Sequence, residues 1–211
     1  LADTLVTPNY LEDVALGVGG YKITGETTLD VAGFSLSSAG DVNGDGFDDV
    51  IIGAFLNDAG GAGAGAAYVV FGGSVRPSSI NLDNVALGTG GFKITGEAAG
   101  DQVGEAVSAA GDVNGDGFDD LIVGAVGNDA GGSGAGAAYV VFGAATPPSS
   151  VNLAALGSAG FKLAGEQASD AAGASVGSAG DVNGDGIDDF IISAVADDAP
   201  GEDFPDSGAA Y

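Results

Sequence analysis

The 211-residue chain contains no cysteine, histidine, methionine or tryptophan, and only four of its residues are basic. Without cysteine it can form neither disulfides nor thiolate metal sites. Without histidine as well, the usual nucleophilic dyads of enzymes are absent. No apolar run is long enough to span a membrane, and no signal peptide is recognisable. The lack of methionine, with a start in the middle of a pattern, indicates a processed or excised chain.

Positive charge is scarce, whereas aspartate and glutamate together number 30 and bring the net charge to −26. Such a surface repels nucleic acids and anionic membranes, so we expect neither nucleic-acid binding nor membrane insertion. It attracts divalent cations. Solubility in a salty or extracellular medium is the alternative reason for the charge.

One acidic string of nine residues occurs three times. It reads DVNGDGFDD at Asp41–Asp49, returns unchanged at Asp112–Asp120, and returns at Asp181–Asp189 with Ile187 in place of phenylalanine. Oxygen-bearing side chains stand at positions 1, 3, 5 and 9, with glycine at positions 4 and 6. Hard cations such as calcium need oxygens that converge from alternate residues of a sharply bent loop. The string therefore predicts one calcium site per copy.

This acidic loop has two alternative interpretations besides a calcium site between two strands. An EF-hand or dockerin loop needs an acidic ligand at position 12 and helices on either side. Position 12 is Ile52, Val123 or Ile192, each inside a strand-like run, which excludes that class. The second reading is a turn rich in Asp and Asn that binds nothing, because these residues favour turns on their own. Three or four carboxylates in nine residues would repel one another there without a cation.

A second acidic pair recurs with a spacing of four residues. It could form an auxiliary cation or ligand site, or it could cap loops through hydrogen bonds to backbone amides, and capping is the favoured reading. The pairs are Glu26 with Asp30, Glu97 with Asp101, and Glu166 with Asp170.

The acidic strings mark repeats, since they start 71 and 69 residues apart. Each repeat has an alternating stretch led by an aromatic residue, such as Tyr21–Glu26, and a segment of small residues before the acidic loop. An apolar run such as Val50–Phe55 and a further strand-like stretch follow the loop. Four short strands per unit without a helical period are typical of β-propeller blades. A parallel β-helix has coils much shorter than ~70 residues.

The motif Ser38–Asp49, followed by a buried strand and Gly-Ala, resembles the FG-GAP repeats of the integrin α-subunit propeller and its bacterial relatives. The resemblance implies an all-β fold built from β-propeller blades of four antiparallel strands. We expect one incomplete propeller region over 1–211. Its parts are a lead segment with an outer strand (1–32), blade 1 (33–97), blade 2 (103–166) and a truncated blade 3 (172–211).

The resemblance also implies one calcium ion in each acidic loop. Its ligands would be the side chains at positions 1, 3, 5 and 9 and the carbonyl at position 7. They are Asp41, Asn43, Asp45, Phe47 and Asp49; Asp112, Asn114, Asp116, Phe118 and Asp120; and Asp181, Asn183, Asp185, Ile187 and Asp189.

Every carboxylate cluster repeats threefold, whereas an active site is normally unique, so we do not expect an enzyme. The resemblance implies a secreted, calcium-binding module for adhesion or for interaction with a protein or a glycan. A structural array that acts as a spacer or filament subunit is the alternative, and an accessory domain of a secreted hydrolase is a further one. Only the loop Asp197–Ser207 departs clearly from its counterparts in the other repeats.

Three blades are too few to close a propeller, since propellers typically have about 4–8. The Tyr21–Glu26 strand comes before the first repeat and has no blade of its own. We therefore expect it to complete a blade outside these three, either in further repeats of the same chain or in a second copy.

Overall fold

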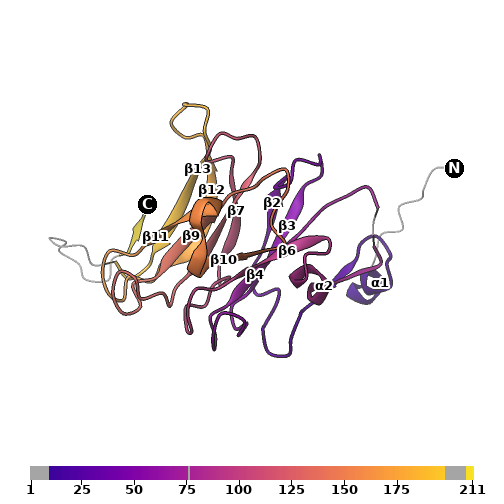
Figure 1. The fold of residues 1–211 in the computed structure, drawn as a ribbon, viewed down its shortest axis with the longest axis horizontal. Helices are drawn as coiled ribbons and strands as arrows, with labels where there is room; N and C mark the ends of the chain where they lie inside the picture. Colours follow the sequence, from indigo (N-terminus) through magenta and orange to yellow (C-terminus); the bar gives the residue numbers. More distant parts are fainter. Residues whose placement is uncertain (1–9, 76, 198–207) are drawn as a thin grey trace.

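A computed structural model describes residues 10–75, 77–197 and 208–211. Residues 198–207, which make up most of the distinctive Asp197–Ser207 loop, lie outside the described residues. The fold is all-β, as predicted, with three antiparallel sheets that follow one another from the purple to the yellow end of the ribbon (Figure 1).

Each sheet is one blade, and its strands occur in chain order from the innermost strand outward. The strands of blade 1 are β2 (Leu36–Gly40), β3 (Asp49–Ala54), β4 (Ala66–Val70) and β6 (Gly91–Thr95). The strands of blade 2 are β7 (Val107–Gly111), β8 (Asp120–Ala125), β9 (Ala137–Val141) and β11 (Gly160–Ala164). The strands of blade 3 are β12 (Ala172–Gly180), β13 (Asp189–Ala194) and β14 (Ala209–Ala210).

Three further strands have three residues each; the first lies within the predicted Tyr21–Glu26 strand, and the other two were not predicted. They are β1 (Lys22–Thr24), β5 (Ser79–Asn81) and β10 (Ser150–Asn152). Strand β10 pairs in parallel with the outer edge of β6, and β5 pairs in the same way with β1. Blade 1 therefore has a fifth strand beyond the predicted four.

The chain also forms short helical turns, one before β1 and the others after β5 and β10, although the sequence shows no helical period. They are α1 (Leu11–Ala15), α2 (Leu82–Ala86) and the 3₁₀ turns η1 (Leu153–Ala155) and η2 (Gly157–Ala159). The side chains of Asn81 and Asn152 cap α2 and η1 by accepting from the backbone N–H two residues on. None of the described helices has the length and apolar character that a membrane span requires.

The apolar cores lie between the blades. Ile51 of β3, together with Leu121 of β8 and Tyr139 of β9, lies in the core shared by blades 1 and 2. Ile122 and Ile192 lie in the core shared by blades 2 and 3. Strand β8 is buried along its whole length, as the sequence predicted for this apolar run. The innermost strand β7 lies between β2 and β12, which places the three blades side by side (Figure 1).

Glycine allows the blades to approach each other at backbone distance. A Cβ on Gly53 would overlap the carbonyl oxygen of Gly104 in blade 2, and one on Gly124 would overlap that of Gly173 in blade 3. The same position in blade 3 is Ser193, whose hydroxyl accepts from the backbone N–H of Ser175. Blade 3 therefore differs from the other two on the face that would meet a following blade.

The two outward faces of the array carry exposed apolar side chains. Ile191 is 48% exposed, although its counterparts Ile51 and Ile122 are fully buried. Leu36 on blade 1 is 67% exposed, whereas its counterpart Val107 is 6% exposed. In the described residues no strand of blade 1 pairs with a strand of blade 3. The three blades thus form an open row.

Candidate functional site

Each acidic loop joins the innermost strand of its blade to the second strand. The loops therefore lie at the same end of three neighbouring blades. Gly44 and Gly46 have φ values of 72° and 87° in the first loop, which supplies the sharp bend that the sequence predicts.

Hydrogen bonds to the backbone close each loop. The Asp41 carboxylate accepts from Asp45 N at 3.0 Å and from Gly46 N at 2.8 Å. Asp45 in turn accepts from Phe47 N at 3.0 Å, and Asn43 Oδ1 accepts from Asp45 N at 2.9 Å. The same bonds recur in the loops that begin at Asp112 and Asp181. The side chains at positions 1, 3 and 5 thus fix the backbone of the loop.

Position 9 lies at the buried base of the loop. The Asp49 carboxylate is 1% exposed and accepts from Val42 N at 3.1 Å and Gly72 N at 2.7 Å. Asp120 is fully buried and accepts in the same way from Val113 N and Gly143 N. Burial raises the pKa of Asp49 and of Asp120 to about 6, and the negative charges at positions 5 and 1 add to the rise.

The donors of each loop are of the kind that a hard cation takes. The predicted ligand positions 1, 3, 5 and 9 supply three carboxylates and an amide oxygen within nine residues, as calcium prefers. The buried carboxylate at position 9 is disfavoured by its neighbours' charge, which a cation would offset. Across residues 10–75, 77–197 and 208–211, however, no three acidic side chains are gathered as a metal-holding group. The donor set fits calcium in kind, and the ligand assignment stays a prediction.

The aspartate at position 8 has a role that the sequence analysis missed. Asp119 Oδ2 accepts from Asp41 N at 2.7 Å, and Asp188 Oδ2 accepts from Asp112 N at 3.1 Å. Each bond links one acidic loop to the loop of the preceding blade. The recurrence of an acidic residue at a position assigned to no ligand was the signal that could have revealed this link. Asp48, the first copy, is exposed.

Asp119→Ala is expected to lower the free energy of unfolding by about 1.5–3 kcal/mol, because a charge-assisted hydrogen bond between two loops is lost. Asp48→Ala removes the same side chain from the same motif where it is exposed, and should change stability by at most ~0.5 kcal/mol. Urea unfolding of both variants in chelator measures the difference without a contribution from metal. Equal losses in the two variants would contradict the link.

The recurrent Glu and Asp pairs form a second kind of cluster. Glu26 accepts from Lys93 Nζ at 2.6 Å and also from the hydroxyl of Tyr68. The ammonium of Lys93 lies 5.3 Å from the centre of the Tyr68 ring. Asn57 donates to Asp30 Oδ2 at 2.6 Å and to the Tyr68 oxygen at 3.3 Å. One lysine, one tyrosine and one asparagine therefore hold both acids.

The cluster repeats in blade 2. Glu97 accepts from Lys162 Nζ at 2.7 Å and from the Tyr139 hydroxyl, and Asn128 donates to Asp101 at 3.0 Å. Burial alone would raise the pKa of Glu26 and of Glu97, but hydrogen bonds from lysine and tyrosine outweigh it and lower both pKa values. Each glutamate thus binds the ammonium group of a lysine from the same chain.

These clusters differ from the expectation for the lysine, and they bear out loop capping for the aspartates but not for the glutamates. The alternation of apolar and polar residues predicts that the lysine at the second position of this stretch points to solvent, but Lys93 is 5% exposed and held by Glu26. Loop capping holds for the aspartates, since Asp101 accepts from Ala98 N and Asp170 accepts from Gln167 N. The sequence pattern did not reveal that the outer strand of a blade places its lysine next to the glutamate of the preceding repeat.

Two segments of the chain, residues 32–70 and 103–141, match the family model for the FG-GAP repeat. Each matched segment runs from the innermost strand of a blade through the acidic loop to the third strand. No curated protein matches the chain.

Proposed function

We propose that this chain, two segments of which match the FG-GAP repeat and whose sheets are propeller-type blades, is a calcium-stabilised binding module that acts outside the cell. Its role would be adhesion, through contact with a protein or a glycan. The proposal has two parts, the metal and the contact, and each can be tested separately.

The observation that carries the calcium part is the linked row of acidic loops. Asp119 and Asp188 join three loops that each hold buried or half-buried carboxylates, in a chain with a net charge of −26. One cation per loop would offset repulsion within that loop and, through the links, strengthen the contact between blades. Bound calcium would therefore hold blades together rather than take part in a reaction.

The repetition of the acidic clusters supports a module without its own catalysis. Glu26 and Glu97 are each held by a lysine and a tyrosine, and the chain has no histidine or cysteine to act as nucleophile or base. These carboxylates are occupied by internal partners and leave no free acid–base pair in blades 1 and 2.

Calcium is expected to raise the melting temperature. At about 100 times the dissociation constant, which for extracellular modules is roughly 10⁻⁴–10⁻³ M, each independent site adds ~2.7 kcal/mol. Calorimetry in chelator and in increasing calcium measures this, with magnesium at equal ionic strength as the control. A melting temperature unchanged up to about 100 mM calcium, roughly 100 times the weakest of these constants, would reject the metal part of the proposal and leave the contact part standing.

A purely structural array is the second candidate. It is favoured by the near-identity of the repeats. Screening against glycans and matrix proteins separates the two candidates, because an array without a specific ligand binds none of them.

A further inference from the structure

Asparagine precedes glycine in each acidic loop, at positions 3 and 4. The first two copies of this pair are Asn43-Gly44 and Asn114-Gly115. The backbone nitrogen of a glycine can attack the side-chain amide of the asparagine before it, because glycine has no side chain to hinder the approach. Asn114 and both glycines are exposed, and Asn43 is half-buried, so water reaches both pairs. Each pair is therefore open to spontaneous chemical modification.

The attacking nitrogen is unoccupied in these two loops. In the described part of the chain, neither Gly44 N nor Gly115 N donates a hydrogen bond. The glycine at position 6 differs, since Gly46 N donates to Asp41 Oδ2 at 2.8 Å and the second loop repeats this bond at 2.9 Å. An aspartate before glycine can cyclise by the same route, but this bond holds the nitrogen that would attack. The asparagine at position 3 is therefore the reactive residue of the loop.

The asparagine amide is polarised by its own loop. Asn43 Oδ1 accepts from Asp45 N at 2.9 Å, and Asn43 Nδ2 donates to Asp45 Oδ2 at 3.2 Å. The second loop repeats both bonds between Asn114 and Asp116, at 2.8 and 3.0 Å. The backbone N–H group stabilises the negative charge that forms on the amide oxygen when its carbon is attacked. The carboxylate lies beside the nitrogen that has to leave.

We infer that Asn43 and Asn114 are modification sites that deamidate without an enzyme. The glycine nitrogen gives its proton to solvent and bonds to Cγ of the asparagine, while the Cγ–Nδ2 bond breaks and Nδ2 takes up a proton and leaves as ammonia. Water then opens the cyclic imide at Cγ, which gives aspartate, or at the backbone carbonyl carbon, which gives isoaspartate. In the third loop Gly184 N donates to Asp181 Oδ1 at 2.6 Å, so we do not assign that copy.

The modified residues lie where neighbouring blades touch. A Cβ on Gly44 would lie 2.5 Å from the Phe118 ring of blade 2. A Cβ on Gly115 would lie 2.8 Å from the Ile187 side chain of blade 3. Isoaspartate adds one atom to the backbone directly before these glycines and shifts them relative to those side chains. Each event also replaces a neutral amide by a carboxylate among other carboxylates, so deamidation loosens the contact between blades.

Protection by calcium rests on the proposed function, whereas the modification itself requires no metal. Asn43 Oδ1 and the Asp45 carboxylate would be fixed by a shared cation, and the amide could then not turn toward Gly44 N. Loops that keep their calcium would stay intact, and loops that lose it would be modified irreversibly.

Tryptic peptide mapping by mass spectrometry tests the inference on the folded 211-residue protein after incubation in chelator at mildly alkaline pH. Trypsin cuts after the three lysines but not after Arg76, which precedes proline, so each acidic loop lies in a separate peptide. The peptides 23–93 and 94–162 should each gain about 1 Da, and fragmentation should place the gain at Asn43 and Asn114. Both should react at least about tenfold faster than the buried asparagines Asn57 and Asn128, which are accessible only after local opening.

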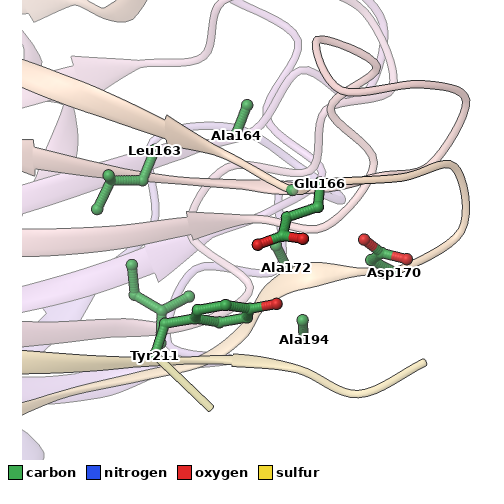
Figure 2. Close-up of a pocket in the computed structure, with 9 residues that line it drawn as sticks. Leu163, Ala164, Glu166, Asp170, Ala172, Ala194 and Tyr211 are labelled. Carbon is green, nitrogen blue, oxygen red and sulfur yellow. The ribbon is translucent and has the colours of Figure 1, made fainter. Parts of the chain in front are cut away.

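Asn57 and Asn128 are the internal controls. They are 2% and 4% exposed and precede aspartate rather than glycine. Each donates to the aspartate of its acidic cluster, at 2.6 and 3.0 Å. In blade 3 this place is taken by Asp197, in the cluster where Figure 2 shows Glu166 and Tyr211, so the comparison uses blades 1 and 2.

Asn114→Gln is the matched variant, because glutamine keeps the amide but cannot close the same ring with the next nitrogen. The peptide 94–162 of this variant should keep its mass, while 23–93 of the same molecules still gains about 1 Da. Three results would overturn the inference: unchanged masses in the folded protein while the chain unfolded in urea deamidates, equal rates at Asn43 and Asn57, or a gain in 94–162 that Asn114→Gln does not remove.

A parallel incubation in calcium separates this inference from the metal proposal. A rate lowered about tenfold or more at Asn43 and Asn114 would support both as calcium ligands. An equal rate in calcium and in chelator would count against those ligands, and the modification measured in chelator would stand.

Discussion

Gly124→Ala is expected to lower the free energy of unfolding by about 3 kcal/mol, the upper end of what overpacking usually costs. The new Cβ would overlap the carbonyl oxygen of Gly173 in blade 3. A backbone atom has no rotamer to change, so the two blades must move apart. Ile122 and Ile192 in the core between them would lose contact as a result.

Gly177→Ala is the matched control for this substitution. Its Cβ would meet only the side chain of Ile191, at an ordinary contact distance of 3.7 Å. We expect a change within ~1 kcal/mol, because alanine restricts the unfolded chain and meets no obstacle in the folded one. Urea unfolding followed by circular dichroism measures both variants. Equal stability of Gly124→Ala and wild type would mean that the blades are not in backbone contact.

Asp120→Ala is expected to cost a similar amount, about 3 kcal/mol, even when no calcium is present. The carboxylate is fully buried and accepts from Val113 N at 3.0 Å and from Gly143 N at 2.9 Å. Its removal leaves two backbone N–H groups without an acceptor, and each such group costs roughly 1–3 kcal/mol. If Asp120 is also a calcium ligand, the variant loses part of the calcium stabilisation in addition.

Asp189→Ala is the matched control at the same position of the motif, since Asp189 is half-buried and, within residues 10–75, 77–197 and 208–211, accepts from Val182 N alone, at 3.0 Å. Both variants are unfolded in chelator and in calcium. The loss in chelator measures the hydrogen bonds, and the further loss in calcium measures the metal. Stability of Asp120→Ala close to that of Asp189→Ala in chelator would contradict the structural role assigned to this carboxylate.

The sequence was sufficient to predict the blades because each strand has a strong local pattern. The apolar run at Val50–Phe55 and its copies could be only buried strands, and the glycines of the acidic string required a bend between two strands. The FG-GAP resemblance and the all-β fold are confirmed. The strands β5 and β10 were missed because three residues are too few to show an alternation.

The partners of the recurrent acids could not be predicted, because they depend on contacts over long sequence distances. Lys93 reaches Glu26 across 67 residues, and Asp119 reaches Asp41 across 78. In a chain read residue by residue, Lys93 has the pattern of an exposed edge lysine. Only the pairing of β6 with β4 places it over Tyr68 and next to an acid of the preceding repeat.

The outer strand of each blade belongs, in sequence, to the lead segment of the following repeat, as β6 does for blade 1 and β11 for blade 2. The sequence repeat and the structural blade therefore begin and end at different strands. Duplication or deletion of one period of about 70 residues, wherever its breakpoints fall, adds or removes one blade and keeps the remaining blades in the same order of strands. Such an architecture can vary in length between lineages by unequal recombination alone, without a new interface having to evolve.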